Sequence, residues 1–187
     1  MLSFFLVAGL RVVFTVPAEL RANWVFQFCW PGDARRYLAG VRRAVGIAIL
    51  LPLFAALVPV HALLWGPRIA ALHFAYGWLA ALILVEALFL HFRKLPFTCA
   101  YLPGKGHLNL RLFWPVYLLA FVTYTYGFAR LERLALETGA RTAAMVVGLC
   151  AVLGALGAYR HWLFRRRPGV IFDELPEPET QTLELSG

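Results

Sequence analysis

The chain has 187 residues, of which 61% are hydrophobic and 15% charged, with a mean hydropathy of +0.69 and a formal net charge of +8 at pH 7. A soluble domain interrupts its apolar runs with charge every few residues, whereas here the uncharged run 44–65 is 22 residues long. The composition therefore excludes an ordinary water-soluble domain and predicts an integral membrane protein.

Five apolar runs follow one another along the chain, and each is expected to cross the membrane. Lipid offers the backbone no hydrogen bonds, so a spanning run must be helical. The predicted fold class is all-α, a polytopic transmembrane helix bundle occupying 1–169. The predicted spans are 2–16, 44–65, 69–92, 112–129 and 142–159.

The first span is shorter than the ~20 residues a spanning helix usually needs, and it contains Arg11. Two interpretations stay open: a short, tilted first helix, or a chain whose natural beginning lies further upstream. We favour the second.

Segment 17–30 is too polar to span, but Leu20, Trp24 and Phe28 recur at i, i+4 and i+8. This spacing predicts an interfacial helix. Asp33 is expected to cap a further helix that runs into the second span. A basic rim for lipid headgroups or other anions is predicted at Arg35, Arg36, Arg42, Arg43 and Lys105.

Lys and Arg gather in segments 17–43 and 93–111 and after residue 159, and they are few in 66–68 and 130–141. Basic loops resist translocation, so this asymmetry predicts an outer N-terminus and a cytoplasmic C-terminus in a bacterial inner membrane. The tail 170–187 is acidic and proline-containing and is expected to be mostly disordered. No nucleic-acid-binding module is visible, so anionic lipid is the expected partner of the positive charge.

Ionisable groups within spans are the best pointers to function, because burying a charge in lipid is costly. Arg11 and Glu86 are expected at similar depth near the cytoplasmic side and are candidates for an ion pair. Such a pair can line or gate a polar path, or it can be static; Arg11 can also extend to the headgroups.

His61 and His73 are expected to face each other, because the turn 66–68 makes the second and third spans antiparallel neighbours. A metal site needs further ligands, and none is expected nearby, so hydrogen-bonded structural histidines are predicted. Tyr117 and Tyr124 share a face of the fourth span, which favours interhelical packing over a polar cavity. Neither a metal nor a cofactor is expected.

The fifth span carries small residues at four-residue spacing, a pattern that lets two helix backbones approach closely. We expect this face to pack on another helix, either of the same chain or of a partner. Its members are Ala144, Gly148, Ala151, Gly154, Ala155 and Ala158.

Two segments carry a resemblance to known proteins: Glu-Leu-Arg-Ala-Asn-Trp-Val-Phe-Gln at 19–27 and Lys-Leu-Pro-Phe-Thr-Cys-Ala-Tyr-Leu-Pro-Gly-Lys at 94–105. There the chain resembles a group of uncharacterised bacterial multispanning membrane proteins, sometimes called permease-like. The resemblance covers most of the first 130 residues and implies that the chain is the C-terminal part of such a protein. It brings no substrate or catalytic residue.

Three functions follow as hypotheses. The first is a transport-related, permease-like membrane domain or subunit that meets a membrane or cytoplasmic protein partner. The alternative is a non-catalytic scaffold or assembly protein held by its small-residue face. The third is a membrane-embedded enzyme acting on lipids, although no hydrolytic motif is visible.

Overall fold

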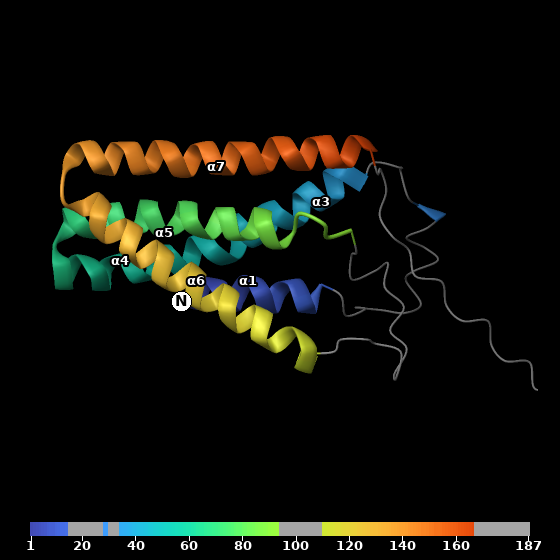
Figure 1. The fold of residues 1–187 in the computed structure, drawn as a ribbon, viewed down its shortest axis with the longest axis horizontal. Helices are drawn as coiled ribbons and strands as arrows, with labels where there is room; N and C mark the ends of the chain where they lie inside the picture. The colour runs from blue at the N-terminus through green and yellow to red at the C-terminus, as the bar shows by residue number, and fades with distance from the viewer. Residues whose placement is uncertain (15–27, 30–33, 94–109, 167–187) are drawn as a thin grey trace, which may run out of the picture.

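A computed structural model of the chain describes residues 1–14, 28–29, 34–93 and 110–166 (Figure 1). All regular secondary structure in these ranges is helical, which confirms the predicted all-α class. Four sequence-based predictions lie outside the described residues: the helix cap at Asp33, Lys105, the tail 170–187, and the interfacial helix 17–30 apart from Phe28 and Cys29.

The helices are α1 (Leu2–Val13), α3 (Ala34–Arg43), the π-helical segment η1 (Ala44–Leu50), α4 (Leu51–Trp65), α5 (Pro67–Leu88), α6 (Leu110–Leu136) and α7 (Gly139–Arg166). They run back and forth along one long axis (Figure 1). At one end lie the start of α3 and α6 and the finish of α5 and α7, and we call it the basic end. The opposite end holds the α4–α5 and α6–α7 turns, and we call it the turn end.

Three helical stretches are long and apolar enough to cross a membrane: Arg35–Trp65, Pro67–Leu88 and Gly139–Arg166. On α5, Arg68 and Glu86 are 18 positions apart, and on α7, Arg141 and Arg160 are 19 apart. At ~1.5 Å per residue these intervals measure about 27 and 28 Å, close to the ~30 Å of a hydrocarbon core. The helices are therefore consistent with an integral membrane protein.

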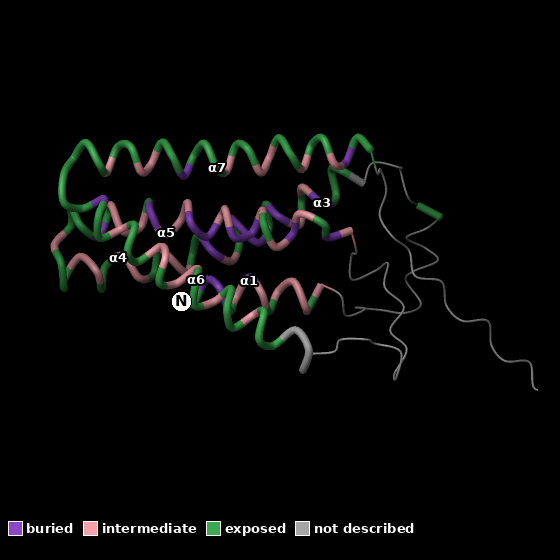
Figure 2. The backbone as a smooth tube through the Cα atoms, in the orientation of Figure 1, coloured by how far each residue is buried: buried purple, intermediate pink, exposed green. Residues whose placement is uncertain are grey.

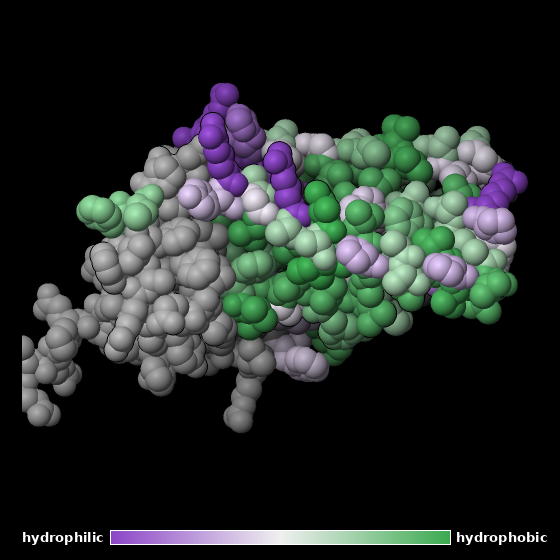
Figure 3. All heavy atoms as spheres, turned by 180° about the vertical axis from the view of Figure 1, so that it is seen from behind, coloured by the Kyte–Doolittle hydropathy of each residue, from purple (hydrophilic) through white to green (hydrophobic). Residues whose placement is uncertain are grey.

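The surface supports the same conclusion. In Arg35–Trp65 and in Gly139–Arg166 alike, only 6% of the most apolar 18-residue stretch is buried inside the bundle. Figure 3 shows apolar side chains over most of the described surface between the ends, with strongly hydrophilic ones gathered mainly at one end. Water does not tolerate so large an apolar surface, whereas lipid does.

The count of five spans stays a prediction. α1 has 12 residues and alone reaches about 18 Å, which is less than the hydrocarbon core. The N-terminus lies partway along the bundle, and α1 runs from there toward the basic end (Figure 1). α6 has 27 residues but is not among the three stretches that meet the criteria of length and apolarity.

Proline positions explain the irregular second span. Pro52 has no N–H to donate and its ring clashes with the carbonyl four residues before it. The chain is π-helical over Ala44–Leu50, and a new α-helix begins at Leu51 with Pro52 in its first turn. Pro59 lies inside α4, which continues through it to Trp65.

The turn between α4 and α5 is tighter than the predicted 66–68. Gly66 alone separates the helices, at φ 82° and ψ 158°, a conformation essentially limited to glycine. Pro67 then begins α5, where its fixed φ suits the first helical turn.

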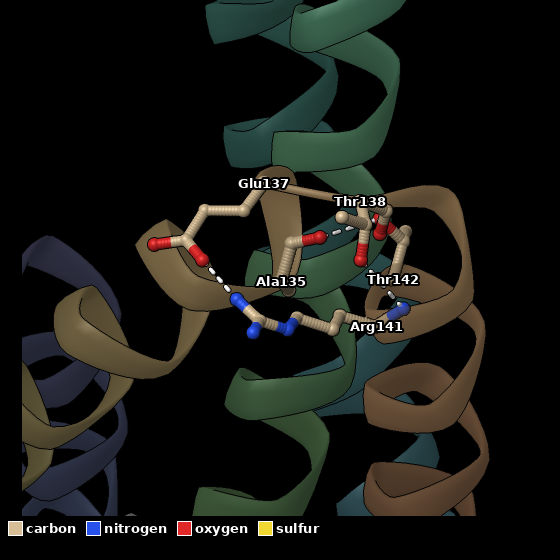
Figure 4. A network of polar contacts seen from close by, with 5 residues as sticks. All are labelled: Ala135, Glu137, Thr138, Arg141 and Thr142. Atoms are coloured by element: carbon tan, nitrogen blue, oxygen red, sulfur yellow. Dashed lines mark hydrogen bonds and ion pairs between the residues drawn. The ribbon is translucent and has the colours of Figure 1, made fainter.

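The α6–α7 turn corrects the predicted loop 130–141, because α6 continues to Leu136 and α7 begins at Gly139. The Thr138 hydroxyl accepts a hydrogen bond from the Arg141 amide at 3.4 Å, as an N-cap does (Figure 4). The Thr142 hydroxyl donates to the carbonyl of Ala135 at 2.7 Å, and Glu137 pairs with Arg141. Arg130, Glu132 and Arg133 consequently lie on a helix.

The core is formed mainly by α1, η1 and α5. Its buried members are Phe4, Val7, Val45, Leu50, Ala81, Leu84, Val85, Phe89 and Phe92. Figure 2 shows that buried positions concentrate on these elements, whereas α7 is exposed along most of its length. α5 is thus the central helix, and it carries polar groups near both of its ends.

Candidate functional sites

At the basic end, Glu86 of α5 is shared by two arginines from other helices. Arg160 of α7 donates from Nη1 to Glu86 Oε1, and Nε of Arg42 of α3 lies 3.8 Å from the same oxygen. The side chains of Arg42, Glu86 and Arg160 are 8%, 16% and 25% exposed. We call these three residues the Glu86 triad.

The triad is not balanced. Two guanidinium groups surround one carboxylate, which leaves an excess positive charge in a largely buried place. The second carboxylate oxygen, Oε2 of Glu86, is buried and has no hydrogen-bond partner among the described residues. A buried carboxylate oxygen without a partner is uncommon and calls for an explanation.

Arg11 and Glu86, the candidates for an ion pair, do not pair with each other. Arg11 lies two positions before the last residue of α1, and Glu86 two positions before the last residue of α5, so the expectation of similar depth was reasonable. Among the described residues, however, the ion-pair partners of Glu86 are Arg42 and Arg160. Depth alone could not tell which side of each helix these residues occupy.

The predicted basic rim divides into two groups. Arg35, Arg36 and Arg43 are exposed, as headgroup binding requires, whereas Arg42 points into the bundle. Arg42 lies over the ring of Phe164, 6.0 Å from its centroid, and Arg35 donates from Nη2 to the Phe164 carbonyl at 3.4 Å. These contacts join α3 to the last turn of α7.

At the turn end, His61 and His73 face each other, as the antiparallel turn predicts. Their rings are perpendicular, with centroids 4.7 Å apart. Trp65 stacks on His61 at 4.9 Å. His73 Nδ1 is hydrogen-bonded to Glu132 Oε1 on α6, so His73 is a hydrogen-bonded histidine.

Glu132 is the residue that sequence reasoning missed. It was assigned to a loop, and the surroundings of His61 and His73 were expected to hold no carboxylate; the extension of α6 brings one there. The signal for it was the i, i+4 series 124, 128 and 132, which continues the aromatic face of α6. No group of three or more His, Cys, Asp or Glu among the described residues is arranged to hold a metal ion.

Tyr117 and Tyr124 of α6 both pack against the core, in agreement with the interhelical packing that their spacing favours. The hydroxyls of Tyr124 and Ser3 lie 3.3 Å apart and connect α6 to α1. Within the described ranges, the Thr125 hydroxyl is buried without a hydrogen-bond partner.

The small-residue face of α7 does not pack within the described bundle. All six members are exposed: Ala144, Gly148, Ala151, Gly154, Ala155 and Ala158. A Cβ atom added to Gly148 or Gly154 would meet nothing within 4 Å. α7 instead turns Leu149 and Phe164 inward, so its larger side chains make the contacts within the chain.

Comparison with known proteins adds nothing to this geometry. A scan against protein-family models found no match, and neither the curated proteins nor the solved structures contain one that matches the chain.

Proposed function

We propose that this protein is a transport-related, permease-like membrane domain or subunit in which the Glu86 triad binds or gates an anionic group at the basic end. The observation that carries the proposal is the unequal charge of the triad. An ion pair that only held helices together would gain most from balanced charges and satisfied hydrogen bonds. Here an excess cation and an unpartnered carboxylate oxygen are kept at the edge of an apolar bundle.

The mechanism follows from the three helices that the triad joins. An anion reaching the basic end competes with Glu86 for Arg42 and Arg160, and the release of Glu86 loosens α5 from α3 and α7. Because α5 is the central helix, a change in its contacts alters its packing against α1 and η1 in the core. This is a gate in the ordinary physical sense: two arrangements that differ in which anion the arginines hold.

The test is transport by the whole chain reconstituted in liposomes. Currents are recorded on a solid-supported membrane while chloride, phosphate, small carboxylates and amino acids are added in turn. We expect at least one of these solutes to evoke a current, and Glu86→Gln to abolish it while the protein stays folded. Glu137→Gln is the matched control, because Glu137 forms an exposed ion pair with Arg141 at the other end. A current unaffected by Glu86→Gln would refute the role of the triad.

A second function, that of a membrane scaffold, is favoured by the exposed small-residue face of α7. Small residues let a second helix approach closely. Purification in mild detergent tests it, since a scaffold brings a stoichiometric partner with it. Gly148→Leu should abolish that association without changing the fold, because the position is open.

We further propose a bacterial inner membrane location, with the basic end cytoplasmic and Arg35, Arg36 and Arg43 contacting anionic headgroups. The charge asymmetry of the described arginines supports this orientation. A reporter that is active only outside the cytoplasm should stay inactive when fused after Gly187. Activity of that reporter would invert the topology.

A further inference from the structure

A second polar cluster lies at the turn end and has no part in the proposed gate. It consists of His61 on α4, His73 and Tyr76 on α5, and Glu132 on α6. His73 and Tyr76 are three positions apart and so share a face of α5. His61, His73 and Glu132 lie four to six positions from the ends of their helices, about 6–9 Å along the helix axis.

We infer that this cluster is a binding site for an exchangeable proton, held by His73 and Glu132 and open to the turn side of the membrane. His73 and Glu132 are joined by a hydrogen bond between an imidazole and a carboxylate. Their side chains are 29% and 20% exposed, so the pair is partly buried but can be reached from outside the bundle. Groups that combine partial burial, a charged partner and access to solvent are those whose protonation responds to function.

The hydroxyl of Tyr76 is the second and independent observation. Tyr76 is only 6% exposed, and its hydroxyl is buried without a hydrogen-bond partner in the part of the chain that the structure describes. Tyr76 lies one helical turn from His73, the hydrogen-bond partner of Glu132, on the same face of α5. A buried hydroxyl without a partner is uncommon, and beside a group that gains and loses a proton it can serve as the alternative hydrogen-bond partner.

A proton fits this cluster better than a metal ion does. The perpendicular packing of His61 and His73 sets the edge of one ring toward the other, and Trp65 covers His61. One nitrogen of His73 is already engaged by Glu132. The described residues hold no group of three ligating side chains arranged for a metal.

The charged groups around the pair come from every neighbouring element. α4 contributes His61. Arg68 on α5 and Arg130 and Arg133 on α6 lie within two helical turns in the sequence. Glu137, five positions after Glu132, adds a negative charge and pairs with Arg141. Within the cluster itself Glu132 is the one carboxylate, so we assign the added proton to it.

The step is balanced as follows. In the resting state the His73 imidazolium donates its N–H to the Glu132 carboxylate. One proton from water on the turn side adds to the carboxylate and forms a carboxylic acid, and the charge of the cluster rises by one. The ion pair between α5 and α6 is then lost, and the Tyr76 hydroxyl is the neighbouring group able to accept the carboxylic acid proton in a hydrogen bond.

Infrared difference spectroscopy of the full chain in lipid nanodiscs tests the inference as the pH is lowered. We expect one protonated-carboxyl band that is absent in Glu132→Gln. In His73→Gln the proton concentration at which this band appears should change by at least about tenfold. The reason is that the carboxylate loses its interaction with His73, and a tenfold change corresponds to ~1.4 kcal/mol. Tyr76→Phe should shift the frequency of the band, since the carboxylic acid loses its partner. Glu137→Gln, the control at an exposed ion pair, should leave the band unchanged.

Two results would overturn the inference: a band that persists in Glu132→Gln, or a midpoint that His73→Gln leaves unchanged. A measurement on the unsubstituted protein keeps the inference testable even if the variants fold poorly. The nitrogen NMR signal of His73 should change over the same pH range as the carboxyl band, and independent titrations would count against a shared proton. Glu86→Gln should leave the band unaffected, so this inference and the proposed gate can fail separately.

Discussion

Replacing Glu86 by Gln tests the structure at its most informative point. The substitution keeps the size of the side chain but removes the only carboxylate that Arg42 and Arg160 share among the described residues. Breaking a buried ion pair by removing one partner costs about 3–5 kcal/mol, because the other charge stays buried and unpaired. Since Arg160 is a quarter exposed, water compensates in part, and we expect a loss of about 2–4 kcal/mol in the free energy of unfolding.

The assay is reversible unfolding in mixed micelles of a mild detergent and sodium dodecyl sulfate, followed by circular dichroism. Glu137→Gln is the control, because its pair with Arg141 is about half exposed and is expected to contribute about 0–1 kcal/mol. A double-mutant cycle then identifies the partner of Glu86. The coupling energy between Glu86→Gln and Arg160→Gln should exceed about 1 kcal/mol, whereas Arg11→Gln should be additive with Glu86→Gln within about 0.5 kcal/mol.

The reasoning fails if Glu86→Gln is no more destabilising than Glu137→Gln. It also fails if the cycle with Arg11 shows the larger coupling energy, since that would restore the pair expected from depth and remove the basis of the triad.

Three further predictions concern packing and the turn. Gly77→Ala should be more destabilising than Gly154→Ala by about 1–3 kcal/mol in the same unfolding assay, because a Cβ at Gly77 would lie 2.8 Å from Cε1 of Phe54, whereas one at Gly154 meets nothing within 4 Å. Phe54→Leu should remove most of that difference; equal stability of the two alanine variants would show that α4 and α5 do not approach so closely. Thr142→Val should lower the stability by about 1 kcal/mol, since it deletes the hydrogen bond to the Ala135 carbonyl at 2.7 Å, and hydrogen exchange in the α6–α7 turn should rise; unchanged exchange there would contradict the geometry of Figure 4. Gly148→Leu should leave the stability of the isolated chain within about 0.5 kcal/mol of the original, and a larger loss would mean that this face of α7 packs inside the bundle.

Part of the two candidate sites could be predicted from the sequence. The facing of His61 and His73 followed from the short turn at Gly66, because two helices joined so tightly must be antiparallel neighbours with matched depth. Glu132 was not assigned to them, because the composition of 130–141 does not distinguish a polar loop from the last turns of a helix, and only the i, i+4 spacing from 124 and 128 indicated a continuing helix. The partners of Glu86 were not predicted for a different reason: in the sequence, Arg42 and Arg160 resemble the basic residues that commonly flank apolar spans.

The sequence by itself determined that this chain is helical and apolar and where its apolar runs lie, although α6 and α7 each continue seven residues past the predicted spans. Long uncharged runs can satisfy their backbone in lipid only as helices, and prolines and Gly66 mark the places where they change. Only the tertiary structure decided which side of each helix faces inward. In the folded chain Glu86 pairs with Arg42 and Arg160 and not with Arg11. His73 contacts the Glu132 carboxylate, and the small-residue face of α7 is exposed. The physical reason is that hydropathy measures depth in the membrane, whereas contacts between helices depend on angle, which side-chain packing alone sets.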